Sequence, residues 1–405
     1  MSTFTSKHLL LGITGSIAAY KAAELASKLT QAGALVDVIL TLAAEKFVTP
    51  LTFQSVTGRK AFTEADLWGG EAHVLHVGLG HTADLLVIAP CTANTIAKLA
   101  HGIADNLLTI TALAADCTIL IAPAMDVGMY ENQATQENIK KLAERGAWIA
   151  GPAEGRMASG LIGKGRMVEP AELLGHIRLV LGKNGKLAGK KVVVTAGGTQ
   201  EAIDPVRIIT NRSSGKQGYA LAQAALDAGG TVVLITAPTG LTPPVGARVV
   251  EIQTAQQMLE AVLAESTDAD ALLMAAAVAD FRPKHFAKNK LKKRDGIPQI
   301  ELEAAPDVLG AVAAQRSKKK RPRVAVGFAA ESRDLLANAS AKLASKKLDM
   351  LAANDITDAD AGFGADTNRV TLLYADGRSE PLPLMSKAEV AEVLIERIAT
   401  LLENQ

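Results

Sequence analysis

Short apolar runs alternate with amphipathic stretches along the first half of the chain. The runs predict buried strands of a parallel sheet, and the stretches predict the helices that cover it. The predicted strands span residues 8–13, 35–41, 84–89, 118–122 and 147–150. The predicted helices span residues 17–31, 43–48, 94–100, 105–115 and 135–144. This alternation predicts a doubly wound α/β domain.

A second α/β pattern follows a segment, Leu181–Gly189, that is rich in Gly and Lys and lacks apolar periodicity. We place the domain boundary there, which gives domains at 1–185 and 186–405. The predicted strands of the second domain span residues 191–195, 231–236, 271–275, 324–327 and 349–352. A hairpin is predicted around Asp376–Gly377, and an amphipathic helix over Lys387–Leu402. The predicted fold class is α/β, with two doubly wound, Rossmann-like domains.

Both halves open with an apolar strand, a glycine-containing turn, a helix and a second strand. This arrangement runs from Leu9 to Thr41 and again from Lys191 to Thr236. It is typical of a mononucleotide-binding βαβ unit, so one nucleotide site is predicted in each domain. A polar insertion in the second turn indicates that the two sites differ in chemistry.

Composition narrows the class of protein. The chain has 405 residues, of which 48% are hydrophobic and 3% aromatic, and this length fits two domains. A net charge of +1 provides no field that would attract nucleic acid or an acidic membrane. Cys91 and Cys117 form neither a metal motif nor a disulfide framework, so we expect a reducing, cytoplasmic location. We expect no signal peptide and no membrane span.

The first glycine turn, in GITGSIAAYK, has features of an anion site. Gly12 and Gly15 permit a tight turn, and Ser16 is predicted to be the N-cap of the next helix, where free amides favour a phosphate. The full GxGxxG spacing is missing, and Thr41 stands where a ribose-binding acid would end the second strand. These features argue against ordinary NAD binding in this turn.

Two further strands end in turns suited to a ligand, IAPCTANT (88–95) and IAPAMDVGMY (121–130). Ligands bind at the carboxyl ends of strands in such sheets, and small hydroxyl residues suit phosphate and flavin contacts. Ordinary βα turns are an equal alternative on these residues alone. His73, His76 and His81 lie close together, but their spacing matches no common metal-ligand pattern.

The insertion in the second half, Asp204–Gly218, is polar and leads into a Gly-x-x-Gly helix start. Amide donors and cations there suit a phosphorylated ligand, although the Walker pattern is absent. An extended loop without function is the alternative, which the length of the insertion disfavours.

Three charged features follow the insertion. MAAAVADF (274–281) is predicted to be a strand end that finishes in Asp280, a position suited to a metal ion or a ribose hydroxyl. Lys290, Lys292 and Lys293 are predicted to form a mobile cationic flap over a triphosphate. The run Arg316–Arg323 is predicted to be a solvated loop, with a nucleic-acid signal as the minor alternative.

Several motifs together resemble known enzymes. GITGSIAAYK, His76 in HVLHVGLG, APCTAN, GIADNLLT and the PAM-x-x-x-M pattern resemble the flavin-dependent cysteine decarboxylases, and the second half resembles the phosphopantothenate–cysteine ligases. Both halves in this order resemble the bifunctional family of coenzyme A biosynthesis. The resemblance implies a flavodoxin-like flavoprotein domain followed by a CTP-dependent ligase domain.

For the first domain, the resemblance implies noncovalent FMN and decarboxylation of 4′-phosphopantothenoylcysteine to 4′-phosphopantetheine. His76 matches the family's active-site histidine, which is suited to act as a base. The positions that match the FMN contacts are Gly15, Ser16, Ile17, Thr41, Pro90, Cys91, Thr92 and Asn94.

Two catalytic positions in this domain depart from the family pattern. Asp126 stands where the family usually has an asparagine that binds the substrate carboxylate, so it must be protonated, paired with a cation or changed in role. Ser159 takes the place of a flap cysteine, and a hydroxyl is a much poorer acid than a thiol. We expect decarboxylation to be intact. The alternative is an active ligase joined to a flavoprotein half that releases an enethiol or is inactive.

For the second domain, the resemblance implies that CTP activates 4′-phosphopantothenate as an acyl-cytidylate, which the amine of L-cysteine attacks. Lys290 is expected to stabilise charge on the phosphoryl group, and Asn211 and Arg207 to bind the intermediate or phosphopantothenate. Mg²⁺ is expected with the triphosphate, with Asp280 as its candidate ligand. The positions that match CTP contacts are Met274, Ala275, Ala276, Asp280, Lys290, Pro306, Asp307, Val308, Leu309, Phe328, Lys342 and Lys346.

The resemblance also implies trimeric flavin domains and dimeric ligase domains, with no nucleic-acid or membrane partner. Two other classes of protein stay open on the residues alone. A nicotinamide oxidoreductase is disfavoured by the first turn and by the insertion in the second. A noncatalytic nucleotide-binding regulator is motivated only by Asp126 and Ser159.

Overall fold

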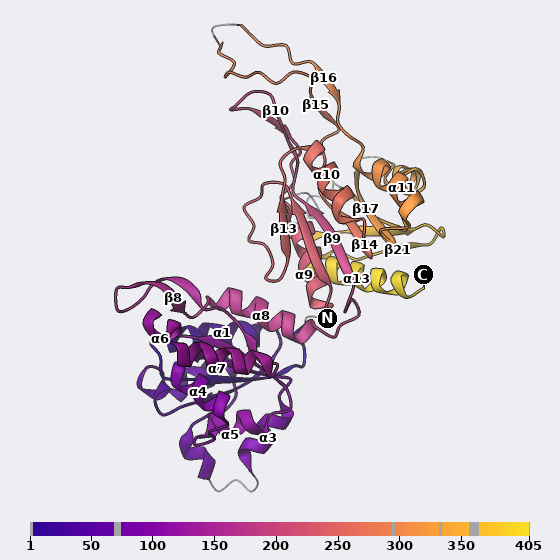
Figure 1. The fold of residues 1–405 in the computed structure, drawn as a ribbon. Helices are drawn as coiled ribbons and strands as arrows, with labels where there is room; N and C mark the ends of the chain where they lie inside the picture. Colours follow the sequence, from indigo (N-terminus) through magenta and orange to yellow (C-terminus); the bar gives the residue numbers. More distant parts are fainter. Residues whose placement is uncertain (1–2, 69–73, 294–295, 332–333, 356–363, 405) are drawn as a thin grey trace. The chain divides into compact units, whose positions relative to one another are not determined.

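A computed structural model describes residues 3–68, 74–293, 296–331, 334–355 and 364–404 (Figure 1). The chain divides into two compact units, Met1–Leu181 and Gly182–Gln405, and each has its own sheet and core. The division falls at the start of the segment that we expected to separate two domains.

The first unit is built on a six-stranded parallel sheet in the order β3-β2-β1-β4-β5-β6. Without the two-residue edge strand β3, this is the strand order of flavodoxin. The strands are β1 (His8–Ile13), β2 (Leu35–Leu40), β3 (Ala61–Phe62), β4 (Leu85–Cys91), β5 (Thr118–Pro123) and β6 (Trp148–Ile149). The predicted α/β class is confirmed for this unit.

Helices cover both faces of this sheet because its strands are apolar on both sides. In β1, Leu9 and Leu11 pack into a core with Leu25 of α1, whereas Leu10 packs into a second core with Leu107 of α5. The helices are α1 (Ala19–Gln31), α2 (Pro50–Thr57), α3 (Leu75–Thr82), α4 (Ala93–His101), α5 (Leu107–Ala114), α6 (Val127–Glu131), α7 (Gln133–Glu144) and α8 (Pro170–Gly182). A hairpin of β7 (Ala153–Arg156) and β8 (Ile162–Arg166) precedes α8.

Some elements of the first unit differ from the sequence prediction. The helix predicted at 43–48 is a single 3-10 turn, Ala44–Lys46. The turn before α1 is also different, because Ala18 and not Ser16 is the N-cap residue. Ser16 lies two residues earlier, and its Oγ accepts a hydrogen bond of 3.2 Å from the Ala18 N–H.

The second unit has an eight-stranded sheet in the order β13-β12-β9-β14-β17-β18-β20-β21. The first six strands in this order are parallel, β20 pairs antiparallel with β18, and β21 pairs antiparallel with β20. The strands are β9 (Lys191–Ala196), β12 (Thr231–Thr236), β13 (Arg248–Glu251), β14 (Ala271–Met274), β17 (Val324–Glu331), β18 (Met350–Asp355), β20 (Val370–Tyr374) and β21 (Ser379–Pro381). The hairpin predicted around Asp376–Gly377 joins β20 to β21, which confirms it.

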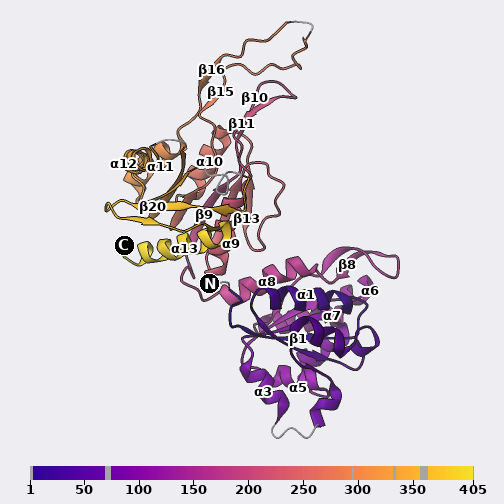
Figure 2. The same ribbon diagram turned by 180° about the vertical axis from the view of Figure 1, so that it is seen from behind.

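Helices and small hairpins complete the second unit (Figure 2). The helices are α9 (Lys216–Asp227), α10 (Ala255–Glu265), α11 (Val308–Lys319), α12 (Leu335–Ser345) and α13 (Lys387–Glu403). The small hairpins pair β10 (Gln200–Ala202) with β11 (Ile208–Thr210), β15 (Phe281–Pro283) with β16 (Leu302–Ala304), and β19 (Thr367–Asn368) with β22 (Met385–Ser386). The polar insertion predicted as a turn therefore contains β11 and the turn that joins it to β10. This hairpin extends beyond the main sheet beside β15 and β16.

The prediction of a solvated loop over Arg316–Arg323 was wrong. Helix α11 continues through Arg316 to Lys319. The Arg316 guanidinium forms an ion pair of 2.6 Å with Asp349 and donates hydrogen bonds to three carbonyl oxygens. The basic run therefore forms the end of α11 and the segment before β17, and its arginines hold neighbouring segments together.

Candidate active sites

Thr14 joins the first glycine turn to the turn that follows β4. Its Oγ1 donates a hydrogen bond of 2.8 Å to the Pro90 carbonyl and accepts one of 3.0 Å from the Thr92 N–H. The turns after β1 and β4 thus form one rigid edge at the carboxyl ends of adjacent strands. Sequence reasoning did not single out Thr14, although its position directly after β1 is a usable signal.

Gly15 lies where no side chain fits. A Cβ built there would come within 2.4 Å of Ala43 Cβ. Thr41 closes the same turn, since its N–H donates to the Ile13 carbonyl at 3.1 Å. Within the part of the chain that the structure describes, the N–H groups of Gly15 and Ile17 donate no hydrogen bond. Two free amides in a tight turn can receive a phosphate, so these residues fit the phosphate of a flavin mononucleotide.

The turn at 90–94 presents hydroxyl and backbone groups, and its cysteine faces inward. Cys91 is fully buried, and burial raises the pKa of its thiol well above the usual range, so it is a neutral packing residue. Thr92 caps α4 by accepting from the Thr95 N–H, and Asn94 is exposed in the first turn of that helix.

His76 lies half-buried in the first turn of α3. His81, at the other end of this helix, is 3.5 Å from Asp116, and His73 lies outside the described residues. In the described ranges, no hydrogen bond joins His76 to the two turns that carry the predicted flavin contacts. Its role as a base stays a prediction.

The two positions that depart from the family pattern contact each other. Ser159, in the turn between β7 and β8, donates a hydrogen bond of 2.5 Å from its Oγ to Asp126 Oδ2. Asp126 is the N-cap residue of α6, and its Oδ1 accepts from the Gly128 N–H at 3.1 Å. The carboxylate therefore fixes the start of α6 and the turn of the hairpin together.

Backbone contacts dock the same hairpin onto the strand-end segment. The Met125 N–H donates to the Gly165 carbonyl at 2.9 Å. A Cβ at Gly163 would lie 2.7 Å from Val127 Cγ2, so only glycine allows this approach. Because the hairpin packs this closely, the Ser159–Asp126 contact belongs to a defined arrangement.

In the second unit, two threonines at the end of β9 and in the glycine turn after it contact the segment that follows β14. Thr195 Oγ1 accepts from the Ala276 N–H at 3.1 Å, and Thr199 Oγ1 accepts from the Ala279 N–H at 2.9 Å. Met274 is buried at the end of β14, and Ala275 and Ala276 follow it. The predicted CTP contacts at 274–276 therefore lie at the carboxyl edge of the sheet, beside the turn after β9.

Asp204 organises the insertion, and sequence reasoning did not select it as a site residue. The residue is 2% exposed, and its carboxylate accepts from the backbone N–H groups of Val206, Arg207 and Leu291. Burial opposes ionisation, but these three donors and the Arg207 guanidinium outweigh it and lower the pKa of the carboxyl. The signal available in the sequence was an aspartate before proline at the start of a turn.

Arg207 and Asn211 tie the insertion to its neighbours. The Arg207 guanidinium is 2.7 Å from Asp204 Oδ2 and donates to the Leu291 carbonyl at 3.1 Å. Asn211 Nδ2 donates to the Val278 carbonyl at 3.2 Å. Lys290, next to Leu291, is exposed and has no ion-pair partner among the described residues. The structure thus links Arg207 to the backbone beside Lys290, and Asn211 to the segment that follows β14.

Asp280 is exposed, but it does not end a strand as predicted. Strand β14 ends at Met274, and Asp280 comes just before β15, where its carbonyl accepts from the Ala305 N–H at 2.9 Å. The described residues contain no group of three or more His, Cys, Asp and Glu side chains suited to a metal ion. Mg²⁺ at Asp280 would therefore need oxygen ligands from the nucleotide and water.

Two further pairs involve predicted CTP contacts. Lys346 Nζ is 2.5 Å from Asp307 Oδ2, and Asp307 Oδ1 caps α11 at the Gly310 N–H. Although burial opposes ionisation of Asp307, the Lys346 ammonium and this N–H lower the pKa of its carboxyl. Lys342 Nζ donates to the Phe328 carbonyl at 2.9 Å. Around this cap, Pro306 precedes Asp307, Val308 is buried, and Leu309 is partly buried.

Comparison with known proteins covers nearly the whole chain. Residues 2–182 match the family described as "Flavoprotein", and residues 187–402 match the family described as "DNA/pantothenate metabolism flavoprotein C-terminal domain". A protein of Bacillus subtilis (strain 168), named coenzyme A biosynthesis bifunctional protein CoaBC, is 45% identical over 98% of this chain and 97% of its own length. The protein of the same name from Vibrio vulnificus (strain CMCP6) is 44% identical over 99% of this chain and 100% of its own.

A solved structure of the C-terminal domain of a protein of this name is 38% identical, with a TM-score of 0.47, and covers 55% of this chain and 100% of that chain. By fold and sequence, the chain is an α/β enzyme that joins a flavoprotein domain to a DNA/pantothenate metabolism flavoprotein C-terminal domain. It belongs to the family of coenzyme A biosynthesis bifunctional proteins CoaBC, which confirms the resemblance. Among the described residues, no helix is long and apolar enough to cross a membrane.

Proposed function

We propose that the chain converts 4′-phosphopantothenate, L-cysteine and CTP into 4′-phosphopantetheine in two steps. The second unit joins cysteine to 4′-phosphopantothenate, and the first unit decarboxylates the product. The observation that carries the proposal is the 44–45% identity to CoaBC proteins over 98–99% of the chain. The loops at the carboxyl edges of both parallel sheets support it, because ligands bind there in such folds.

In the first unit, FMN is the proposed cofactor. The free amides of Gly15 and Ile17 would hold its phosphate, and Ser16, Thr41 and the turn at 90–94 would line the remainder. When bound, FMN supplies the electron transfer that makes loss of CO2 from the substrate possible. His76 is the proposed base for the proton that the substrate loses.

We assign a proton-carrying role to the Asp126–Ser159 pair. A substrate carboxylate placed beside Asp126 would repel its charge, and the proposed role has the two carboxyl groups share one proton. Loss of CO2 leaves an electron pair on the adjacent carbon, which must gain a proton. Ser159 can give its hydroxyl proton to that carbon while it receives one from Asp126, because the two side chains already share a hydrogen bond of 2.5 Å. Asp126 is ionised at the end of this transfer.

In the second unit, the carboxylate of 4′-phosphopantothenate attacks the α-phosphorus of CTP and releases pyrophosphate. The amine of cysteine then attacks the acyl-cytidylate, which gives the amide and CMP. Lys290 is the proposed residue that neutralises the phosphoryl charge, and its exposure without an ion-pair partner in the described residues supports this role. Asn211 is held for substrate contact by Val278, and Arg207 positions the loop through Asp204. We propose Mg²⁺ at the triphosphate, with Asp280 as a ligand.

We also propose that the flavin-site face of the first unit is covered by further copies of the chain. Ile17, Tyr20 and Leu42, which flank the predicted flavin turn, have exposed fractions of 62%, 63% and 66%. Large apolar side chains gathered at one face mark an association surface. The family resemblance makes trimeric flavin domains and dimeric ligase domains the expected assembly.

Two measurements test the proposal. We expect the purified protein to show an FMN absorption spectrum. We also expect continued pyrophosphate release over many turnovers only when CTP, 4′-phosphopantothenate and cysteine are all present. Without cysteine, release should stop at about one pyrophosphate per active site, because the acyl-cytidylate is not consumed. A colourless protein, or wild type that releases no pyrophosphate, would refute the corresponding half.

A further inference from the structure

A basic pocket of about 450 Å³ lies at the opposite edge of the second sheet from the predicted CTP loops. It is formed by the C-terminal end of α11 and by the segments that precede β17 and β18. Its lining residues are Ala313, Arg316, Ser317, Lys320, Arg323 and Lys347. Four of the six carry positive charge, and none is acidic.

The arginines are fixed, whereas the lysines are free to bind. Arg316 is held by Asp349 and by carbonyl oxygens, and Arg323 donates to the Leu402 carbonyl at 2.8 Å. Lys320 and Lys347 are exposed, and neither ammonium has a partner within the ranges that the structure describes. Both residues have left-handed backbone, with φ of 58° and 50°, at the ends of α11 and α12.

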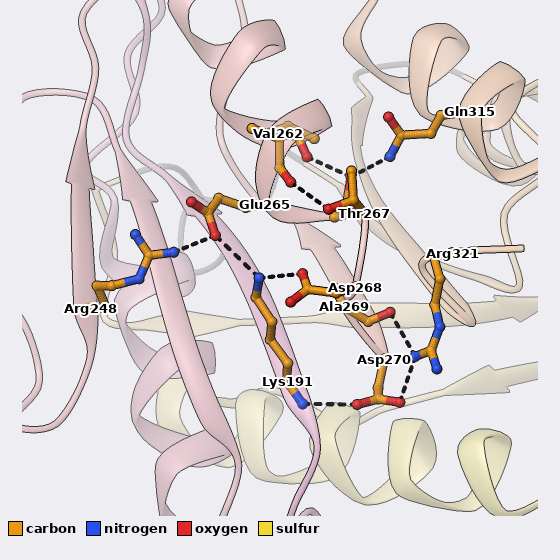
Figure 3. Close-up of polar contacts among 12 residues, drawn as sticks. Lys191, Arg248, Val262, Glu265, Thr267, Asp268, Ala269, Asp270, Gln315 and Arg321 are labelled. Carbon is orange, nitrogen blue, oxygen red and sulfur yellow. Dashed lines mark hydrogen bonds and ion pairs between the residues drawn. The ribbon is translucent and has the colours of Figure 1, made fainter. Parts of the chain in front are cut away.

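Nearby acids are already neutralised. Asp270, at the start of β14, is 2.8 Å from the Arg321 guanidinium and accepts from the Lys191 N–H, and Lys191 Nζ pairs with Asp268 (Figure 3). Asp270 and Asp349 are therefore already paired with arginines, and neither forms an ion pair with Lys320 or Lys347.

A role in helix stability alone does not account for this arrangement. Lysines at helix C-termini offset the helix dipole, and Lys318 and Lys319 already do so at the end of α11. Lys347 and Arg323 come from other segments, yet they line the same hollow. A pocket of this volume is within the range that holds small molecules.

We propose that this pocket binds a small molecule that carries two or more linked phosphate groups. Two mobile ammonium groups suit multiple phosphate oxygens, and the Arg323 guanidinium and Ser317 hydroxyl add donors. The phosphates would replace water around cations that have no acidic partner, so binding should weaken as salt rises.

Helix α11 and Lys346 connect the pocket to the predicted CTP site. This point rests on the proposed function. Helix α11 begins at the Asp307 cap and reaches the pocket at Arg316, about 13 Å along its axis. Lys346, which pairs with Asp307, is followed directly by Lys347 of the pocket. A phosphate that draws Lys347 toward the pocket would strain the Lys346–Asp307 pair. Occupancy should therefore change the apparent KM for CTP.

Inorganic tripolyphosphate is the probe for a calorimetric titration of the full-length protein. Lys320→Gln/Lys347→Gln is the test variant. Lys318→Gln/Lys319→Gln removes the same total charge, from the end of α11, at two lysines that do not line the pocket. Lys290→Ala removes the proposed phosphoryl contact in the CTP site, so binding at that site should weaken in this variant, whereas binding in the pocket should not.

We expect a class of binding sites that persists in Lys290→Ala and in the control, and that weakens about tenfold in the test variant, since each exposed ion pair contributes a factor of a few. Binding that is equal in the test variant and wild type, or that weakens equally in the control, would overturn the proposal. The assay needs neither cysteine nor 4′-phosphopantothenate. Absence of pyrophosphate release would therefore refute the ligase function while leaving this binding result intact.

Discussion

Ser159 Oγ lies 2.5 Å from Asp126 Oδ2, so the two departures from the family pattern form one contact. A carboxylate without this partner would face the substrate carboxylate alone. The hydroxyl can donate to an ionised Asp126 and can accept from a protonated one, which lets the pair gain and pass a proton. Asp126 and Ser159 are therefore best understood as a single unit.

Substrate binding should take up a proton at this pair. We expect wild type to absorb protons when 4′-phosphopantothenoylcysteine binds, because the proposed role requires Asp126 and the substrate carboxylate to share one proton. Asp126→Asn should bind without uptake. Calorimetry in buffers of different ionisation enthalpy measures this directly. Glu131→Gln, in the same helix α6, is the control and should behave as wild type; equal uptake in Asp126→Asn would exclude the role.

The rate effects of the two residues should not add. Asp126→Ala and Ser159→Ala should each slow formation of the saturated thiol, and the double variant should be little slower than either one, because each change breaks the same proton path. Product analysis by mass spectrometry follows the reaction. Fully additive losses would show that the two side chains act separately.

Gly15→Ala should empty the flavin site. A Cβ at this position would meet Ala43 Cβ at 2.4 Å, so the turn that offers the free amides must shift. The flavin absorbance per protein should fall strongly in the purified variant. Gly240→Ala places its Cβ in open space in the other unit and should keep the wild-type flavin content. Retained flavin in Gly15→Ala would remove this turn from the site.

Lys290→Ala should reduce CTP-dependent pyrophosphate release by roughly 100-fold to 1,000-fold, as loss of a charge-stabilising group does. Lys288→Ala, an exposed lysine two residues earlier, is the matched control. A similar small loss in both variants would mean that the segment contributes general positive charge and that Lys290 has no specific role.

Asp204 should make the ligase unit sensitive to acid. Its pKa is lowered in the folded protein, so its stabilising effect is complete above the ordinary unfolded value of about 3.9 and is lost as pH falls through the folded value. Asp204→Asn should therefore lower the Tm at neutral pH, and the difference from wild type should vanish in strong acid. A Tm difference that is the same at every pH would argue against the ionised side chain as its cause.

The sequence pattern predicted the sheets well because buried parallel strands such as β4 and β9 are continuous apolar runs. It failed where tertiary contacts decide the structure. Arg316 looks solvated in a basic run, but Asp349 lies 33 positions away and pairs with it only in the fold. Each of Ser159 and Asp126 was identified as a departure from the family pattern. Because they are also 33 positions apart, the sequence did not predict their contact.

The sequence also failed to predict three local features: the N-cap of α1, the hairpin of the insertion and the role of Asp204. Ser16 has the residue type of an N-cap, but the chain makes one further turn before α1 begins. The insertion was predicted as a polar turn because its hairpin strands have only three residues each, too few to show a periodic pattern. Asp204 carries no periodic signal at all, and its importance follows from three backbone donors that meet only in the folded loop.

The most direct test of the account is a coupled reaction that starts from 4′-phosphopantothenate, L-cysteine and CTP, with mass analysis of the product. The account predicts one pyrophosphate, one CMP and one CO2 for each molecule of saturated thiol, 4′-phosphopantetheine. A product lighter by two hydrogens, or accumulation of 4′-phosphopantothenoylcysteine without loss of CO2, would contradict it.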